Sequence, residues 1–311
     1  MNNDQYLGTK RYYSVSEYFI KTFGKKVYKL SLNANFSCPN RDGSKSTGGC
    51  IFCSAGGSGD FAETITDNLG LSLLKAKQRI VRKSGTDKFI AYFQSYTNTY
   101  APAIELEKLF LPVINRKDVV ALSIATRPDC LPDDVLQLLN KLNCIKPVFV
   151  ELGLQTIHDK TAEFINRCYP TSEYDIAVKK LKAIGVNVVT HLIIGLPGED
   201  EQMIIQSAKH VAKSGADGIK LQLLHLLKNT RLSDYYEQTQ FEILSLEKYT
   251  QILANVISVL PPSMVIHRIT GDAPKKDLIE PKWSADKKRV LNYIKCYFEE
   301  NNVIQGSNYV D

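Results

Sequence analysis

Residues 27–53 read VYKLSLNANFSCPNRDGSKSTGGCIFC, and the order of features in this stretch indicates the fold. The first ten residues are apolar and alternating, which predicts a β-strand. A loop with three cysteines begins at the carboxyl end of that strand: Cys38, Cys50 and Cys53. Four thiolates close an iron–sulfur cluster or a structural zinc site, whereas three leave one metal position open for chemistry. No histidine precedes His158, so the sequence offers no obvious fourth ligand nearby.

Apolar, β-branched runs alternate with helical patterns along most of the chain. We predict strands at 27–36, 89–94, 119–125, 147–154, 187–194 and 218–224. Between them, apolar residues recur three and four apart, as in Leu106, Leu109 and Val113. This alternation indicates βα units and a parallel sheet. Six such units without further strands make a partial barrel, so the expected fold class is α/β, a partial (β/α)6 TIM-like barrel.

The ends of the chain are expected to be additions to one continuous domain. Residues 1–24 form an N-terminal extension with a short helix at 15–23, and residues 25–227 form the core barrel. In the C-terminal extension, 228–311, we expect a helix at 244–260, one more strand at 264–269 and a last helix at 285–300. This extension is expected to pack on the core.

Composition excludes several classes of protein. No apolar run approaches the roughly 20 residues of a membrane span, and Met1-Asn2-Asn3-Asp4 does not begin a secretory signal. Seven cysteines in such a chain indicate ligands and buried thiols rather than disulfides. We therefore expect a cytoplasmic protein that does not bind membranes. The net charge of +6 is mild and does not by itself require nucleic acid as a partner.

Polar side chains follow the predicted strands at the ends where parallel βα proteins place their active sites. On the fourth strand, alternation puts Glu151, Gly153 and Gln155 on one face, and a carboxylate and an amide inside a barrel are costly unless they meet a ligand or each other. The other strand-end candidates are Gln94, Ser95, Tyr96 and Tyr100, then Arg127 and Asp129, then His191, Gly195 and Leu196, then Lys220, Gln222 and His225, and finally Arg268.

The cysteine spacing, C-x11-C-x2-C after the first strand, resembles the cluster site of radical S-adenosylmethionine (radical SAM) enzymes. In that superfamily a [4Fe–4S] cluster on three cysteines binds S-adenosylmethionine (SAM) through its fourth iron. The long first gap, which opens with Cys38-Pro39, resembles the branch of the elongator catalytic subunit, and most closely the bacterial YtqA/YhcC group. Further segments fit this resemblance: Thr126-Arg127-Pro128-Asp129, Glu151 to Thr156, Asn166-Arg167, and Gly195 to Glu199.

The resemblance implies residue roles. Cys38, Cys50 and Cys53 would hold the cluster, Arg167 would bind the SAM carboxylate and His191 would lie near the ribose. The other implied SAM contacts are Gln94, Ser95, Glu151, Gln155, Gly195 and Leu196. One departure concerns the second strand, where the superfamily usually carries Gly-Gly-Glu and this chain has Gln94-Ser95-Tyr96.

The resemblance also implies a substrate, the wobble uridine of tRNA. The implied step converts 5-carboxymethylaminomethyl-uridine to 5-aminomethyl-uridine. The implied partners are tRNA, an electron donor such as flavodoxin or ferredoxin, and a downstream tRNA methyltransferase. Candidate substrate residues are Tyr96, Tyr100, Lys220, His225 and Arg268. Two basic sets are candidate phosphate contacts: Lys75, Arg79, Arg82 and Lys83, and Lys275, Lys276, Lys287 and Lys288.

Two alternatives stay open at this point. One is a radical SAM enzyme that acts on a small-molecule or porphyrin-like substrate. The other is a non-catalytic protein with zinc on the three cysteines and a distant fourth ligand. The remaining cysteines, at 130, 144, 168 and 296, form no C-x-x-C pair, so no second cluster is expected. The sequence does not identify the catalytic residue, the site of hydrogen abstraction or the oligomeric state.

Overall fold

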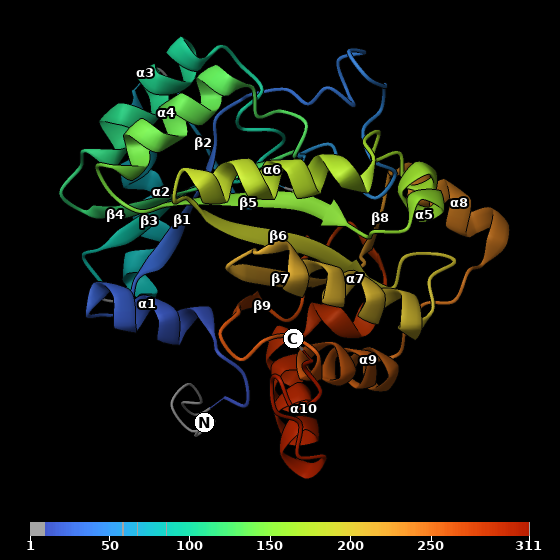
Figure 1. Cartoon of the computed structure of the whole chain (residues 1–311). Helices are drawn as coiled ribbons and strands as arrows, with labels where there is room; N and C mark the ends of the chain where they lie inside the picture. Colours follow the sequence, from blue (N-terminus) through green and yellow to red (C-terminus); the bar gives the residue numbers. More distant parts are fainter. Residues whose placement is uncertain (1–9, 58, 67, 85, 311) are drawn as a thin grey trace.

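The structure is a computed structural model that describes residues 10–57, 59–66, 68–84 and 86–310, without the side chains of residues 79 and 81–84. Its centre is a sheet of eight parallel strands in the order β2-β1-β3-β4-β5-β6-β7-β9 (Figure 1). The strands are β1 (Tyr28–Asn33), β2 (Glu63–Thr64), β3 (Phe89–Phe93), β4 (Val119–Thr126), β5 (Val148–Gln155), β6 (Asn187–Ile194), β7 (Gly218–Leu223) and β9 (Val265–Arg268). The edge strands β2 and β9 do not pair with each other, so the sheet is open. The predicted partial barrel is confirmed.

Helices pack around the sheet (Figure 1). They are α1 (Val15–Phe23), α2 (Leu69–Ser84), α3 (Ala103–Ile114), α4 (Asp133–Asn143), α5 (Asp159–Phe164), α6 (Thr171–Ala183), α7 (Glu201–Ser214), α8 (Arg231–Thr239), α9 (Leu246–Ser258) and α10 (Lys287–Glu300). A separate antiparallel pair joins β8 (Leu226–Leu227) to β10 (Leu278–Glu280), and a short 3-10 helix, η2 (Lys282–Ala285), follows.

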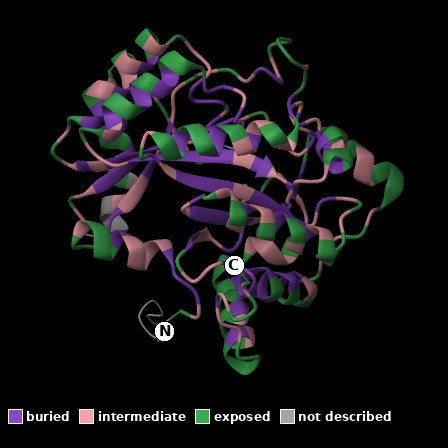
Figure 2. Ribbon diagram, viewed as in Figure 1, coloured by how far each residue is buried: buried purple, intermediate pink, exposed green. Residues whose placement is uncertain are grey.

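Helix α7 shows how local sequence sets an element. Asp200 caps its first turn by accepting a hydrogen bond from the Met203 N–H at 2.9 Å. Its buried residues recur at helical spacing on one face, namely Ile204, Ser207, Ala208 and Val211. Gly215 ends the helix in the left-handed conformation, φ 89°, which glycine adopts without a Cβ clash. The result is one apolar face against the sheet and one exposed face, as Figure 2 shows for the helices in general.

Strand β5 shows that the sheet has two different faces. Val148, Val150, Leu152 and Leu154 belong to the main hydrophobic core between sheet and helices. The alternate residues, from Phe149 to Gln155, point to the inner face. At the amino end of the inner face, Phe19 of α1 packs on Phe149 with ring centroids 6.0 Å apart, in one cluster with Val189. An apolar plug therefore closes the bottom of the barrel and leaves the polar residues above it.

Most element bounds differ from the expectation by one or two residues, and strands β1 and β9 differ in ways that matter for the fold. Strand β1 stops at Asn33 rather than residue 36, because Asn35 takes φ 60° and donates its N–H to the Asn33 side-chain oxygen at 3.0 Å. Strand β9 pairs in parallel with β7, so part of the predicted C-terminal extension completes the sheet itself. Among the described residues, no helix is long and apolar enough to cross a membrane.

Candidate active site

A cavity of about 840 Å³ opens where the parallel strands end. The sheet and the cysteine loop share its lining, so segments distant in sequence meet there. Most of the residues predicted from the sequence line this one cavity: Cys38, Cys50, Cys53, Gln94, Tyr96, Glu151, Gln155, Arg167, His191, Lys220, His225 and Arg268. The structure thus brings together the predicted cluster ligands and most of the predicted cofactor and substrate residues.

The cysteine loop is held in place by hydrogen bonds to later parts of the chain. The Asn40 side-chain nitrogen donates to the backbone oxygens of Asn166 at 2.6 Å and Arg167 at 3.2 Å, and it lies 3.7 Å from the Cys50 sulfur. The Ile51 N–H donates to the backbone oxygen of residue 165 at 3.1 Å. Arg231, the first residue of α8, donates to the Gly49 backbone oxygen. Both ends of the loop therefore have fixed positions before any cofactor binds.

The three cysteines line one cavity, where they could hold a metal cluster. Burial, with the nearby Cys53 and Cys38 adding to it, raises the pKa of the Cys50 thiol to about 12. Metal binding is the interaction that would keep such a thiol deprotonated. Within the described residues, no three His, Cys, Asp or Glu side chains converge on one metal ion. In an iron–sulfur cluster held here, each of the three cysteines would bind a different iron.

Glu151 lies at the centre of a buried polar network below the cavity. Its carboxylate accepts hydrogen bonds from Lys29 at 2.5 Å, Ser123 at 2.6 Å and His191 at 2.8 Å, and from Lys220. Its side chain is 0% exposed. All of its strong acceptor positions are therefore used inside the protein. Direct contact of Glu151 with SAM stays a prediction, and the role that the structure gives it is to hold the two lysines and the histidine.

The network shifts the protonation of each member. Burial alone would raise the pKa of Glu151, but Lys220 and Lys29 hold it well below its usual range. Burial lowers the pKa of Lys220 to about 7, with Glu151 opposing this and Lys29 adding to it. Burial and then the charge of Lys220 lower the pKa of His191 to about 4. His191 is therefore neutral near pH 7, with Nε2 donating to Glu151 and Nδ1 accepting from Gln222 at 3.3 Å.

Arg167 has a structural function that the sequence did not indicate. It is 1% exposed, and its guanidinium donates to the backbone oxygens of Leu154, Thr156 and Tyr169 and to the Thr171 hydroxyl. These bonds tie the end of β5 to the start of α6. Its predicted contact with the SAM carboxylate stays a prediction, since most of its donors already have partners.

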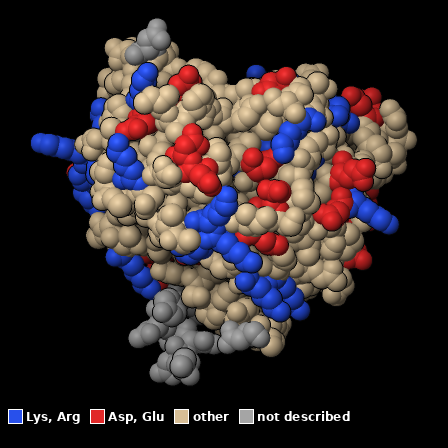
Figure 3. Space-filling view, turned by 45° about the horizontal axis from the view of Figure 1, so that its top comes forward, with Lys and Arg blue, Asp and Glu red and all other residues tan. Residues whose placement is uncertain are grey.

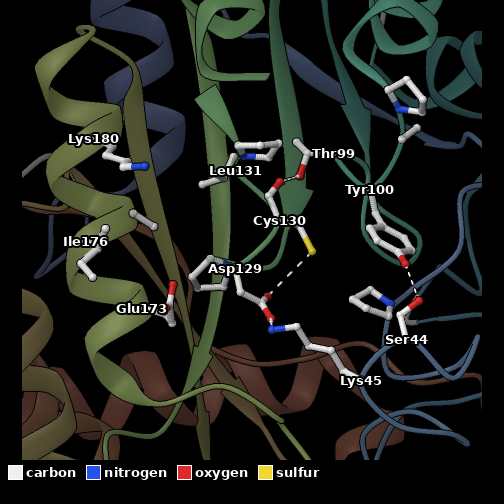
Figure 4. Close-up of a pocket in the computed structure, with 16 residues that line it drawn as sticks. Ser44, Lys45, Thr99, Tyr100, Asp129, Cys130, Leu131, Glu173, Ile176 and Lys180 are labelled. Carbon is white, nitrogen blue, oxygen red and sulfur yellow. Dashed lines mark hydrogen bonds and ion pairs between the residues drawn. The ribbon is translucent and has the colours of Figure 1, made fainter. Parts of the chain in front are cut away.

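Four of the predicted cofactor and substrate residues do not line the main cavity. Ser95 is 1% exposed, and its hydroxyl has no hydrogen-bond partner among the described residues. Gly195 and Leu196 also lie outside the lining, and Leu196 belongs to a small apolar cluster beside the cavity. Tyr100 lines a second cavity of about 720 Å³, where its hydroxyl lies 2.7 Å from the Ser44 hydroxyl (Figure 4).

The second cavity lies on the other side of the cysteine loop. Figure 4 shows Lys45 reaching Asp129, with which it forms an ion pair at 2.8 Å. Asp129 also accepts two hydrogen bonds from Arg127, at 2.8 and 2.9 Å. Arg127 and Asp129 therefore pair locally, and with Lys45 they fix the loop after β4 against the cysteine loop.

Sequence reasoning missed several residues of the main site. In the sequence Lys29 belongs to a basic flank of the first strand, yet in the structure it reaches the buried carboxylate of Glu151. Tyr92 accepts a hydrogen bond from Lys220 at 3.0 Å inside the barrel. Arg41 donates to the backbone oxygens of Cys53 and Ser54, at 3.3 and 2.6 Å. Alternation in the first two strands, which puts Lys29 on the same face as the polar Ser31, was the available signal.

Cationic side chains surround the rim of the cavity near β9. Arg268 lies 3.3 Å from Asp272, and Lys287 lies 2.6 Å from the same carboxylate. Lys275 also lines the cavity. His225 shares a hydrogen bond with the Ser284 hydroxyl at 3.1 Å, and burial lowers the pKa of this imidazole to about 4. The rim therefore has more cations than carboxylates.

Comparison with known proteins gives the family. A family model described as the radical SAM superfamily matches residues 43–211, and one described as the radical SAM C-terminal domain matches residues 216–300. YtqA of Bacillus subtilis is 46% identical over 96% of this chain and 92% of its own length. YhcC of Escherichia coli strain K12 is 36% identical over 92% of each.

More distant relatives share the core. A tRNA uridine(34) acetyltransferase of Methanocaldococcus jannaschii is 26% identical over 59% of this chain and 34% of its own length. The solved structure of Methanocaldococcus infernus Elp3 with an N-terminal deletion superposes with a TM-score of 0.64 at 21% identity, covering 75% of this chain and 59% of the other. That likeness concerns the fold.

These matches decide for an enzyme over a non-catalytic zinc protein, and they agree with the cysteine cavity at the strand ends. Members of the superfamily use a [4Fe–4S] cluster together with SAM. The chain belongs to the radical SAM superfamily, within it to the group of YtqA and YhcC, and is a radical SAM enzyme with those two cofactors.

Proposed function

We propose that this enzyme modifies the wobble uridine of tRNA, removing the carboxymethyl part of 5-carboxymethylaminomethyl-uridine to leave 5-aminomethyl-uridine. The single observation that carries the proposal is the shared cavity, which has three cysteines on one wall and a cationic wall near β9. The specific uridine step comes from the resemblance to the YtqA/YhcC group. Similarity to a tRNA uridine(34) acetyltransferase supports tRNA as the substrate class.

Within this proposal, Cys38, Cys50 and Cys53 hold the cluster. Gln94, Gln155 and the neutral His191 face the bound SAM from the ends of β3, β5 and β6. The Gln155 backbone takes φ 64°, and a Cβ at Gly153 would lie 2.5 Å from the Gln155 amide nitrogen. A side chain at Gly153 would therefore displace this amide from its place on the cavity floor.

When bound, the two cofactors would supply a hydrogen-abstracting radical: SAM would take up one electron from the reduced cluster and a second with the hydrogen atom that is removed from the substrate. Removal of the carboxymethyl group would balance this: its methylene carbon loses one electron with the abstracted hydrogen atom and a second electron back to the cluster, and water then completes the break of the C–N bond to give the amine and a two-carbon oxoacid. The protein's own part is to position the methylene group and to exclude bulk water from the radical.

The proposal includes partners that act outside the cavity. A reduced electron donor such as flavodoxin or ferredoxin supplies electrons to the cluster. A tRNA methyltransferase then acts on the 5-aminomethyl product. Tyr96 and Arg268 at the cavity wall are candidates to hold the splayed base by stacking and edge contacts.

The test is mass spectrometry of tRNA nucleosides from cells that lack the gene. We expect 5-carboxymethylaminomethyl-uridine to accumulate and its 5-aminomethyl derivatives to disappear. The wild-type gene should restore the normal pattern, and a Cys50→Ala variant should not. Cys144→Ala is the matched control, because that cysteine is exposed at the end of α4, and it should restore the pattern fully. Unchanged wobble uridines in the deletion strain would reject the tRNA substrate.

A further inference from the structure

The buried network contains more basic side chains than carboxylates. Lys29 and Lys220 share one carboxylate, Glu151, and the side chains of these lysines are only 21% and 7% exposed. Near the rim, Arg268 and Lys287 likewise share one carboxylate, that of Asp272. A buried charge is costly unless it is paired, so the inner set has a second lysine whose charge Glu151 cannot balance as well, whereas Arg268 and Lys287 are partly exposed to solvent.

The lysine of the inner set that faces the cavity is Lys220. Lys220 and Arg268 both line the cavity, whereas Lys29 does not. Lys29 reaches Glu151 from β1 and balances its charge from below. The charged and titratable groups around the Lys220 ammonium come from five strands: Lys29 of β1, Tyr92 of β3, Glu151 of β5, His191 of β6, and Arg268 with His267 of β9.

We propose that Lys220 and Arg268 form a subsite for the carboxylate of the substrate, with Lys29 as a positioning residue that balances Glu151. This inference rests on the proposed function, in which the substrate carries a carboxymethyl group. A carboxylate is the ligand that the wall lacks, because it accepts several charge-assisted hydrogen bonds and cancels one unbalanced charge. The 5-aminomethyl product has no carboxylate, so the same subsite favours release of the product over the substrate.

The register between neighbouring strands supports a shared subsite. His191 pairs with Lys220 across β6 and β7, and Lys220 pairs with Arg268 across β7 and β9. The two cations are therefore neighbours on adjacent strands at one level of the sheet. Their mutual repulsion lowers the pKa of Lys220, after burial and Lys29, and a bound carboxylate would reverse this effect.

The test compares three anticodon hairpins that differ only at position 34, which carries 5-carboxymethylaminomethyl-uridine, 5-aminomethyl-uridine or unmodified uridine. Binding is measured by titration calorimetry on the anaerobic holoenzyme without reductant, so that no turnover occurs. We expect the wild type to bind the carboxylate-bearing hairpin about tenfold more tightly than the other two. Lys220→Met should remove most of this preference while leaving the affinity for the unmodified hairpin unchanged.

Two further variants separate a carboxylate subsite at Lys220 from the general effect of removing any lysine. Lys29→Met should also reduce the preference, although Lys29 does not line the cavity, because Glu151 would then neutralise Lys220. Lys213→Met, at an exposed position on α7, is the matched control and should keep the preference. Calorimetry at about pH 7.5 in buffers of different ionisation enthalpy should show proton uptake with the carboxylate-bearing hairpin only, and Lys220→Met should abolish it.

The other outcomes are distinct. Binding of all three hairpins with equal affinity would uphold RNA as the substrate and overturn the carboxylate subsite. A loss of SAM affinity in Lys220→Met, with the hairpin preference intact, would assign the subsite to the SAM carboxylate and also overturn the inference. No binding of any hairpin would overturn the proposed function together with the inference that rests on it.

Discussion

Lys220 lies inside the barrel with its ammonium 4.5 Å from the centre of the Tyr92 ring and bonded to the Glu151 carboxylate. Burial lowers its pKa to about 7, whereas a lysine in the unfolded chain titrates at ~10.4. Between these two pH values the unfolded state holds a proton that the folded state lacks. Stability linked to this group is therefore lowest below about pH 7 and rises with pH up to about 10.

Lys220→Met removes this titration. We expect the unfolding free energy of the wild type, minus that of the variant, to increase from about pH 7 to about pH 10. The measurement is anaerobic urea denaturation at a series of pH values. In Lys213→Met, whose lysine is exposed, the corresponding difference should stay flat. A flat or falling difference for Lys220→Met would show that the amine keeps its proton throughout this range.

Individual side chains also mark where sequence reasoning stopped. The spacing of polar residues at strand ends correctly gathered Gln94, Gln155 and His191 at one cavity. It could not show that Ser95 turns away, because Tyr96 takes φ 57° and interrupts the alternation of a strand. It also could not show that Arg167 bonds to backbone oxygens, since those acceptors appear only when the end of β5 meets the start of α6.

Among the elements, α8 has an unexpected link to the cysteine loop. Arg231 donates to the Gly49 backbone oxygen, and the Leu232 N–H donates to the Ile51 oxygen at 3.0 Å. Gly49 itself takes φ 78°, and a Cβ there would lie 2.9 Å from the Arg41 guanidinium. The start of α8, which belongs to the C-terminal part of the chain, therefore fixes the residues on either side of Cys50, a predicted cluster ligand.

We expect Arg231→Ala to loosen the loop without unfolding the protein. The variant should retain less iron after anaerobic reconstitution, and its visible cluster absorption should decay several-fold faster when a chelator is added. Arg289→Ala is the matched control, because Arg289 is exposed near the start of α10. Equal iron content and equal decay in both variants would show that the loop needs no support from α8.

The sequence predicted the bounds of helices and strands better than it predicted which strands pair. The bounds of α1 and β6 agree with the prediction, since α1 has an apolar period and a capping residue, Ser14, and β6 is rich in β-branched residues. The pairing of β9 with β7 was not predicted, because some 40 residues that include α8 and α9 separate these strands in sequence. Long-range parallel pairing leaves no local pattern, whereas helix periodicity and caps are local.

At the scale of the whole molecule, the inner face of the barrel changes character along its axis. An apolar plug around Phe19 and Phe149 lies at the bottom, the network around Glu151 lies above it, and the cavity opens at the top. Cations concentrate at this opening on the β9 side. On the face in Figure 3, however, basic and acidic side chains are interspersed. Phosphate contacts are therefore expected near the cavity rather than over one uniform basic surface.

The last prediction concerns these phosphates. If tRNA binds, cations beside the cavity neutralise phosphates and release counterions, so affinity falls steeply with salt. Reversing Lys275, Lys276 and Lys288 to Glu should weaken tRNA binding at low salt. It should also reduce the slope of log affinity against log salt by about 0.7–0.9 for each phosphate that the variant no longer neutralises. Exposed substitutions of this kind usually change stability by only ~0.5 kcal/mol, so the fold should remain intact.

The control reverses charge on a remote helix. Lys209 and Lys213 are exposed on α7, and changing both to Glu should leave the salt slope unchanged. The second basic set from the sequence is Lys75, Arg79, Arg82 and Lys83, and the side chains of its last three members lie outside the described residues. Its reversal to Glu is a separate arm of the same titration. Because the base must enter the cavity, we expect the cations on the β9 side to account for the larger part of the slope of log affinity against log salt. An equal slope in the wild type and all variants would place the RNA elsewhere.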